Sequence, residues 1–589
     1  MVDRWYVETA LSKRWPFYTR ANVGEVFPDP VAPASFSFAF QDETGLKGAE
    51  LGFRDAYAKI GAFDPAEYPP DESLFLGVAN GYCYLNASAL RILGYRAPGM
   101  TTDDIDASFF GDAPGVPPFV AQPGDERPDL TEKIGATFQW VLTTDGLPEV
   151  AADEAMLRDL RGARRDPSTM SNRELLDHCW GILDEHFRAL FTQHLYVSFV
   201  ATLPFGILTG TCAALGRPEA ALGLMAGLGD VESAAPSMAM WDLGREVAAS
   251  TALSAVFDGP AAGRHDRLTS SDHPDVRAWL GGFDEFLRRY GSRGPNEWET
   301  RSPTWETHPD LALAAIDRMR LSPESSSPHV LNLDRSVERE ALGAELAAML
   351  DGDPAAQGQF VAALRAATIF MPGRERTKSN CIKLIQEGRV LLREWGRRMV
   401  AAGVFPRVES YGMLTRAEGY AVIEDPAGWY DELVERELRY EEVKALQEPF
   451  LFVGSPPPMP TYPLRSSVAH AAARAGEVLV GVSGCPGKAV GRARVLRDSH
   501  DPSALEPGDV LVAPITDPSW TPLFVPAIAV VVDVGAPLSH AIIVSRELGI
   551  PCAVSVTDAT HRIPDGALVE VDGTAGTVTV LELPAGLPA

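Results

Sequence analysis

The stretch from residue 534 to 551 constrains the fold of this chain most, because it reads as the end of a buried strand, a glycine turn and a short helix. Ser539 is a favourable N-cap, and Gly549 followed by Pro551 predicts the end of the helix. The helix between them has an apolar stripe at i, i+3 and i+7: Ala541, Val544 and Leu548. His540 is therefore predicted in the first helical turn, where free backbone N–H groups and the helix dipole favour an anion.

Strand-like segments surround this helix. Residues 509–513, 527–532 and 552–556 are continuous apolar runs, which are typical of buried strands. Residues 567–580 alternate apolar and polar side chains around the turn residues Asp572 and Gly573, and predict a hairpin. The C-terminal part is therefore predicted to be a β/β/α domain that carries His540.

Histidine suits the transfer of a phosphoryl group. Imidazole is largely neutral near pH 7, is nucleophilic, and releases a phosphoryl group more readily than a serine hydroxyl does. Thr516 and Ser539 are candidates to orient the phosphate or the ring, and the loop that follows Thr516 offers further polar side chains: Asp517, Ser519 and Thr521. The same polarity is typical of an ordinary turn, and the sequence leaves open which ring nitrogen is phosphorylated.

Three segments together resemble the swivelling phosphohistidine domain of the phosphoenolpyruvate-utilizing enzymes, the group that includes phosphoenolpyruvate synthase, pyruvate phosphate dikinase and rifampin phosphotransferase. They are residues 481–495, 507–522 and 534–551. The resemblance implies that residues 477–585 form this domain and that His540 is the phosphorylated residue. Two positions depart from the family pattern, since Ala536 replaces a common glycine and Ile542 replaces a small residue.

A proline-rich spacer precedes this domain. Residues 453–476 are predicted to form the linker as a whole, and all of its prolines lie within residues 455–463. A polyproline path is extended and stiff, at about 3.1 Å per residue, which suits the arm of a swivelling domain. The alternative is a segment that simply follows the protein surface.

Long amphipathic stretches dominate residues 1–452, which are predicted to form a mainly α-helical, acceptor-binding region. A loop rich in proline and glycine near residues 112–128 predicts a subdivision. The chain as a whole is thus predicted to be multidomain, with a large helical N-terminal region and the smaller β/β/α domain. The predicted helices are 129–162, 172–200, 274–290, 336–351 and 376–402.

Short motifs in the helical region resemble the acceptor-binding region of rifampin phosphotransferase and the histidine-bearing subunit of phenylphosphate synthase. They lie at residues 21–28, 81–86, 290–297 and 373–378. They supply two sets of candidates. The first set would orient phosphate by its charge: Arg293, Arg374 and Arg376. The second set would bind the acceptor: Asn22, Glu25 and Glu297.

Each of these residues also has an ordinary structural interpretation. Arg374 and Arg376 suit a solvated helix face, and Arg293 with Glu297 suits a turn-stabilising ion pair. The remaining two, Asn22 and Glu25, suit a cap or a turn.

Composition excludes several classes of partner. The net charge of −28 argues against a nucleic-acid backbone as partner. Six scattered cysteines without a CxxC spacing predict reduced, structural thiols. The N-terminus has no apolar signal core, and Thr202 and Pro204 interrupt the longest apolar run, residues 196–208. We therefore expect a cytoplasmic protein without a membrane segment.

No segment resembles the ATP-grasp domain that charges this histidine in the family, and no ligand cluster predicts a bound metal ion or cofactor. The resemblance to phenylphosphate synthase implies that an ATP-grasp partner subunit supplies ATP and Mg²⁺. The predicted function is the acceptor and phosphohistidine subunit of a split phosphotransferase acting on a hydroxyl, for example a phenolic one. A non-catalytic phosphocarrier, or a ligand-binding regulator switched by His540 phosphorylation, is the alternative.

Overall fold

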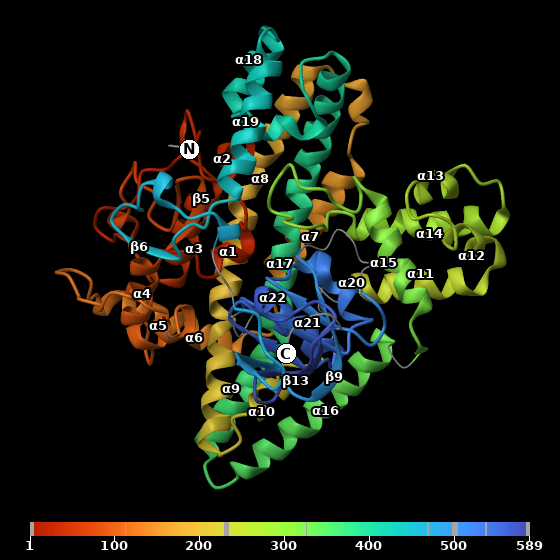
Figure 1. The fold of residues 1–589 in the computed structure, drawn as a ribbon. Helices are drawn as coiled ribbons and strands as arrows, with labels where there is room; N and C mark the ends of the chain where they lie inside the picture. Colours follow the sequence, from red (N-terminus) through yellow and green to blue (C-terminus); the bar gives the residue numbers. More distant parts are fainter. Residues whose placement is uncertain are drawn as a thin grey trace. The chain divides into compact units, whose positions relative to one another are not determined.

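The structure is a computed structural model that describes residues 5–111, 113–228, 235–324, 327–467, 471–497, 505–535 and 539–584. Parts of two predicted segments lie outside these ranges. They are residues 468–470 of the linker and residues 536–538 of the histidine motif, which is the strand-turn-helix segment 534–551. The chain forms two compact units, both assembled from segments distant in sequence (Figure 1). Unit 1 comprises Met1–Leu203, Trp298–Ser302 and Arg376–Ala469, and unit 2 comprises Pro204–Glu297, Pro303–Glu375 and His470–Ala589.

Unit 1 contains a small antiparallel sheet of order β4-β5-β1-β6. Its hairpin turns at Asn80-Gly81, where both residues have positive φ (50° and 86°), as a two-residue hairpin loop requires. The sequence did not predict this sheet, because strands this short carry little periodic signal. The strands are β1 (Phe17–Thr19), β4 (Leu76–Ala79), β5 (Tyr82–Asn86) and β6 (Leu451–Val453).

Helices make up most of unit 1, which confirms the mainly helical prediction. The predicted helix 129–162 is in fact two helices, because the first ends at Thr143 and Pro148 begins the next. The predicted helix 172–200 is confirmed, and it starts at a capping box between Ser171 and Glu174. The helices of unit 1 include α3 (Gly48–Ile60), α6 (Pro128–Thr143), α7 (Pro148–Gly162) and α8 (Asn172–Val200).

One long helix, α17 (Pro354–Ala401), contributes to both units and contains the predicted helix 376–402 except for its last residue. Pro372 lies inside it, shortly before the boundary between Glu375 and Arg376. Unit 2 contains the remaining predicted helices, of which 336–351 begins earlier than expected. The helices of unit 2 include α11 (Ala235–Ala249), α14 (Pro274–Tyr290), α15 (Pro309–Leu321) and α16 (Pro328–Met349).

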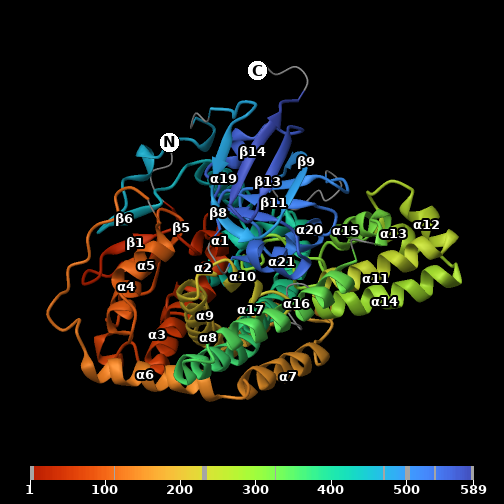
Figure 2. The ribbon, with the colours of Figure 1, turned by 90° about the horizontal axis from the view of Figure 1, so that it is seen from below.

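The C-terminal part of unit 2 is built on a sheet of order β7-β14-β13-β9-β10-β11-β12-β8 (Figure 2). Strands β9 to β12 are parallel, and β13 and β14 form the predicted antiparallel hairpin. The predicted apolar runs are β10, β11 and β12, buried throughout. The strands are β7 (Val478–Val480), β8 (Val482–Cys485), β9 (Lys488–Val495), β10 (Val510–Ala513), β11 (Ala529–Val532), β12 (Cys552–Val554), β13 (Leu568–Asp572) and β14 (Thr577–Glu582).

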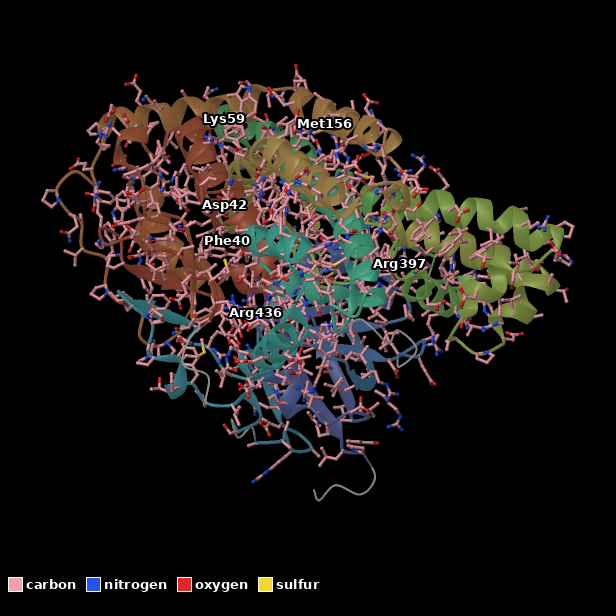
Figure 3. All side chains as sticks on the ribbon, turned by 90° about the horizontal axis from the view of Figure 1, so that it is seen from above. Phe40, Asp42, Lys59, Met156, Arg397 and Arg436 are labelled. Atoms are coloured by element: carbon pink, nitrogen blue, oxygen red, sulfur yellow. The ribbon has the colours of Figure 1, made fainter. Side chains whose placement is uncertain are left out.

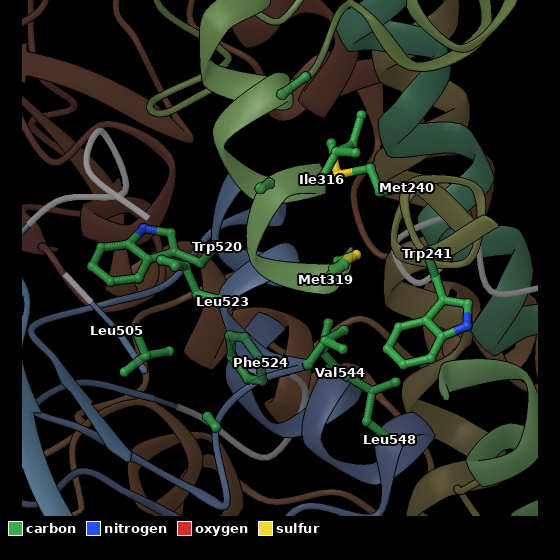
Figure 4. Close-up of a cluster of buried hydrophobic side chains, with 14 of the residues drawn as sticks. Met240, Trp241, Ile316, Met319, Leu505, Trp520, Leu523, Phe524, Val544 and Leu548 are labelled. Carbon is green, nitrogen blue, oxygen red and sulfur yellow. The ribbon is translucent and has the colours of Figure 1, made fainter. Parts of the chain in front are cut away.

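An apolar core joins this sheet domain to the helices of unit 2. Figure 4 shows Met319 of α15 and Trp241 of α11 facing the side chains of two short helices, α20 (Thr521–Phe524) and α21 (His540–Leu548). Phe524 is 0% exposed in this core and Val544 is also 0% exposed. The helix that carries His540 is thus held on its apolar side by packed side chains.

The proline-rich segment 455–463 lies against unit 1 in the structure. The amide of Asn80 donates hydrogen bonds to the Pro457 carbonyl (3.0 Å) and to the Tyr462 hydroxyl (2.8 Å), and Met459 is buried. The segment therefore follows the surface of unit 1, which is the alternative that the composition allowed. The role of residues 453–476 as a swivel arm, and the domain boundaries on either side, stay predictions.

One helical run in the described part of the chain, Asn172–Ala214, is long and apolar enough to cross a membrane by length and composition alone. A buried core helix passes the same test. This run therefore carries no assignment to a membrane.

Candidate functional site

His540 is the first residue of α21, as predicted, and both of its ring nitrogens have threonine partners. Nδ1 lies 3.1 Å from the Thr516 hydroxyl, and Nε2 lies 3.0 Å from the Thr521 hydroxyl. The Phe524 ring stands edge-on to the imidazole, with centroids 5.8 Å apart. Since a hydroxyl can donate or accept, this pair holds either neutral tautomer of the ring. The half-buried imidazole is thus fixed in orientation without being sealed from solvent.

Thr516 and Thr521 belong to the segment between β10 and β11, and Asp517 braces that segment. Its carboxylate accepts hydrogen bonds from the Ser519 N–H (2.8 Å) and the Ser519 hydroxyl (2.5 Å). Burial raises the pKa of Asp517, and the negative charge of Glu297 raises it further. The loop geometry therefore depends on a carboxylate whose charge is costly to keep.

Ser539 occupies the N-cap position of α21, but its side chain makes no capping hydrogen bond. Its hydroxyl oxygen is buried and has no hydrogen-bond partner within the described residues. The expectation of an ordinary serine cap is therefore wrong in its hydrogen bonding. A buried hydroxyl that gives up its cap bond costs stability, and it remains able to bind an oxygen beside His540.

Helix α21 is buried on nearly every side, including its charged positions. Arg546 and Glu547 are only 3% and 2% exposed. The Arg546 side chain donates to the Gly484 carbonyl (3.1 Å), and burial lowers the pKa of this guanidinium to about 10. The Glu547 carboxylate accepts from the Leu228 N–H (3.4 Å). The position of His540 is thus determined by a helix with little freedom to shift.

The turn that follows α14 contacts the segment between β10 and β11, which carries Thr516 and Asp517. Within this turn Arg293 pairs with Glu297 at 3.1 Å, and the two residues are 3% and 1% exposed. The N–H of Asn296, a residue with φ of 50°, donates to the Asp517 carboxylate at 3.0 Å. Unit 2 therefore brings the predicted site residues Arg293, Glu297 and Thr516 into the same region as His540.

The other predicted site residues are distributed differently. Arg374 also belongs to unit 2, where it lies 3.6 Å from the carboxylate of its neighbour Glu375. Arg376 belongs to unit 1, where it forms a bidentate ion pair with Glu154, both contacts being 2.7 Å.

Asn22 and Glu25 lie at the start of unit 1. Asn22 is exposed and has a φ of 64°, and its carbonyl accepts a turn hydrogen bond from the Glu25 N–H. Their predicted roles in acceptor binding stay predictions.

The sequence identified Thr521 and Asp517 only as polar residues of a loop. It did not indicate that Phe524 lies beside His540, or that Asn296 contacts the segment between β10 and β11. Thr521 could have been found from its position at the start of a short apolar helical segment. The contact of Asp517 with Asn296 spans 221 positions in the chain, and no local pattern signals it.

The described residues contain no group of three or more His, Cys, Asp or Glu side chains arranged to hold a metal ion. All six cysteines are free and buried, as the sequence analysis predicted for structural thiols. Burial raises the pKa of the Cys552 thiol to about 12 and that of the Cys485 thiol to about 11. These thiols are therefore protonated and unreactive at neutral pH.

Two family models match this chain. Residues 505–576 match the mobile domain of PEP-utilising enzymes, and residues 193–375 match the fourth domain of rifampicin phosphotransferase. Residues 505–576 are thus similar to the mobile domain of phosphoenolpyruvate-utilising enzymes. This confirms the resemblance on which His540 was singled out.

Curated relatives agree with these models. The chain is 31% identical to the rifampicin phosphotransferase of Streptomyces sviceus over 51% of its length and 33% identical to an uncharacterized protein of Mycobacterium tuberculosis over 50%. It is 25% identical to the prodigiosin synthesizing transferase PigC of Serratia marcescens over 98%. The matched segments make up 34%, 31% and 64% of those three proteins, so the chain spans less than two-thirds of each relative.

Proposed function

We propose that this chain is the phosphohistidine-carrying and acceptor-binding component of a phosphotransferase that phosphorylates a hydroxyl group on a small molecule, for example a phenol. The observation that carries the proposal is the fixed, half-buried imidazole of His540, held between Thr516 and Thr521 at the N-terminus of α21. A nucleophile needs both access and a set orientation, and this arrangement provides both.

The proposed reaction has two phosphoryl transfers. In the first, a nitrogen of His540 attacks phosphorus, an N–P bond forms, and the P–O bond to the leaving group breaks. In the second, the acceptor oxygen attacks, an O–P bond forms, the N–P bond breaks, and the hydroxyl proton passes to a base. Positioning and charge stabilisation supply most of the catalysis in such transfers.

Several side chains of the chain have proposed roles in these steps. Thr516 and Thr521 orient the ring, and Ser539 offers a buried hydroxyl to a phosphate oxygen. Arg293 supplies positive charge beside the loop, where Glu297 balances it in the absence of phosphate. Arg374 and Arg376 are proposed to neutralise phosphate charge, and a further set is proposed to contact the acceptor: Asn22, Glu25 and Glu297.

We propose that an ATP-grasp partner protein charges His540. ATP, water and the histidine would yield phospho-His540, AMP and phosphate, with the β-phosphoryl group transferred. Mg²⁺ would bridge the nucleotide phosphates in the partner's site. We propose that the protein acts in the cytoplasm, where ATP is available.

The experiment starts from the chain labelled with radioactive phosphate on His540 and removes the partner and ATP. A set of phenols and aliphatic alcohols is then added, and loss of label from the protein is compared with its appearance on the small molecule. We expect at least one hydroxyl compound to gain the label at the rate at which the protein loses it. Label that leaves only as inorganic phosphate, or stays on the protein with every compound, would favour the phosphocarrier or regulator instead.

A further inference from the structure

The carboxylate of Asp517 is held from two sides within unit 2. Its oxygen Oδ1 accepts hydrogen bonds from the Ser519 N–H (2.8 Å) and the Ser519 hydroxyl (2.5 Å), which belong to the same segment between β10 and β11. Its oxygen Oδ2 accepts the Asn296 N–H (3.0 Å) from the turn that follows α14. Donors on both oxygens fix the orientation of a carboxylate as well as its position. The side chain therefore ties the segment between β10 and β11 to the helical part of unit 2.

This tie lies between the two threonines that hold the imidazole of His540. Thr516, on Nδ1, directly precedes Asp517 in the chain, and Thr521, on Nε2, follows in the same segment. A shift of the backbone at Asp517 would carry both hydroxyls away from the ring. Because a hydrogen bond weakens steeply as its distance and angle depart from the ideal, such a shift would free the ring to rotate.

The same local arrangement occurs at a carboxylate of unit 1. Asp42, labelled in Figure 3, accepts from the Thr44 N–H (2.8 Å) and the Thr44 hydroxyl (2.6 Å), as Asp517 does from Ser519. This arrangement is an ordinary turn motif and implies no function by itself. The second oxygen of Asp42 pairs with the Lys47 ammonium group (2.8 Å). Asp517 differs in that its second oxygen reaches a turn that is distant in the sequence.

The charges that face the two carboxylates differ as well. Burial opposes the charge of Asp42, but the hydrogen bond from Lys47 holds the pKa of that carboxyl below its usual value. Burial raises the pKa of Asp517, and the charge of Glu297 in the turn raises it further. The contact between Asp517 and the turn is thus a poor stabiliser of the fold, and what it provides is the position of the segment.

We propose that Asp517 is a positioning residue for His540, because it ties the segment to the turn after α14 and thereby keeps both threonines on the ring. The inference rests on the proposed function, which makes the imidazole the nucleophile. The ring is oriented for attack on phosphorus while the segment stays on this turn, and it loses that orientation when the contact with Asn296 breaks.

The test labels His540 with phosphoramidate, a small phosphoryl donor that needs neither ATP nor a partner protein. A ring nitrogen attacks phosphorus, an N–P bond to the ring forms, the N–P bond of the donor breaks, and ammonia leaves. Asp517→Asn places an NH₂ group where one oxygen accepted a hydrogen bond, so label should appear on the His540 peptide of the intact chain about tenfold more slowly. Asp42→Asn is the matched control and should label at the wild-type rate.

A comparison of two backgrounds separates positioning from a loss of stability. In a chain that carries Thr516→Val and Thr521→Val, Asp517 has no hydroxyl left to position. Asp517→Asn should then slow labelling by less than about twofold. A loss of stability would slow labelling equally in both backgrounds, so a tenfold effect in each of them would overturn the inference.

The turn after α14 supplies an independent check. A Cβ at Gly294 would collide with the Pro303 carbonyl oxygen, so Gly294→Ala must move the turn that carries Asn296. It should slow labelling by about tenfold when Asp517 is present and by less than about twofold in the Asp517→Asn chain. Gly281→Ala is the control, at an α14 position where a Cβ would meet nothing within 4 Å among the described residues. Equal slowing by Gly294→Ala in both chains would overturn the inference.

The outcomes separate this inference from the proposed function. A wild-type chain that takes no label on His540 would count against the proposed function and would overturn the inference with it. Label on the wild-type chain, together with the same rate in Asp517→Asn, would overturn the inference alone.

Discussion

The C-terminal domain and the second half of α17 bury polar side chains in opposite ways. Strands β10 and β11 are wholly apolar and buried, and the polar groups near His540 lie in loops at their ends. The second half of α17 instead carries polar side chains at most 1% exposed: Thr377, Ser379, Asn380, Gln386 and Arg389. In the first region a half-buried histidine stands out as functional. In the second, buried polarity is common, so residue type alone does not separate a site from a structural network.

The largest expected effect is at His540. His540→Asn keeps a planar, hydrogen-bonding side chain but removes the nucleophile, so acceptor phosphorylation should fall by about 10⁴-fold or more. The rate of label transfer to the acceptor measures it. His561→Asn, a change in the same domain at a histidine bonded to Arg497, is the matched control and should retain activity. Similar losses in both variants would show that the domain is merely disturbed.

In α17 a substitution is expected to lower stability and not to remove a catalytic group, because the buried polar side chains of this helix hold the structure together. The Arg389 guanidinium donates to Gln386 (2.6 Å) and to the carbonyls of Glu299 and Thr300 (3.0 and 3.1 Å). Arg389→Met leaves these acceptors without that donor, so unit 1 should lose about 3 kcal/mol of stability or more. Hydrogen exchange of α17 amides measures this. Arg397→Met, at a 64% exposed side chain on the same helix, should cost under about 1 kcal/mol.

A smaller effect, dependent on pH, is expected at Asp533 beside the histidine motif. Burial raises the pKa of this carboxyl to about 6, even though it accepts hydrogen bonds from Thr560. A raised pKa means that the folded state binds the proton more tightly. Stability from this group is therefore full below its unfolded value, near 3.8, and is lost as pH rises through about 6.

Asp533→Asn should remove that dependence. Relative to wild type, the variant should gain at most about 3 kcal/mol as pH rises from about 3 to about 7, most of it between about pH 3.8 and about pH 6. Hydrogen-exchange protection of β11 in both proteins checks this. A difference between them that does not change with pH would contradict the assignment.

The smallest expected effect concerns the two threonines that hold the imidazole. Thr516→Val and Thr521→Val should each slow labelling of His540 by about tenfold, because each removes one hydrogen bond that orients the ring. Serine at either position should restore the rate, since it returns the hydroxyl. Thr577→Val on β14 is the control. If the valine variants label at the wild-type rate, the threonines do not position the histidine.

The same contrast explains what the sequence could predict. The strands β10 and β11, the helix at His540 and its end at Gly549 follow from local patterns of apolar residues and turn residues. The contact of Asp517 with Asn296 does not, because it joins positions 221 residues apart. The pairing of β1 with β6 is of the same kind.

Local patterns also failed where a local detail decided the outcome. The 129–162 stretch has continuous helical periodicity, yet Pro148 starts a new helix within it. Ser539 has the residue type and backbone of an N-cap, but its hydroxyl does not make the cap bond.

The most direct test of the central claim is to locate the phosphate. The chain is incubated with ATP, Mg²⁺ and a candidate ATP-grasp partner, then digested and analysed by mass spectrometry at neutral pH, with an acid-treated aliquot beside it. The account predicts one phosphoryl group on the peptide that contains His540, absent after acid treatment and absent from His540→Asn. Acid-stable phosphate on Ser539, or no phosphate on this peptide while the partner converts ATP to AMP, would contradict it.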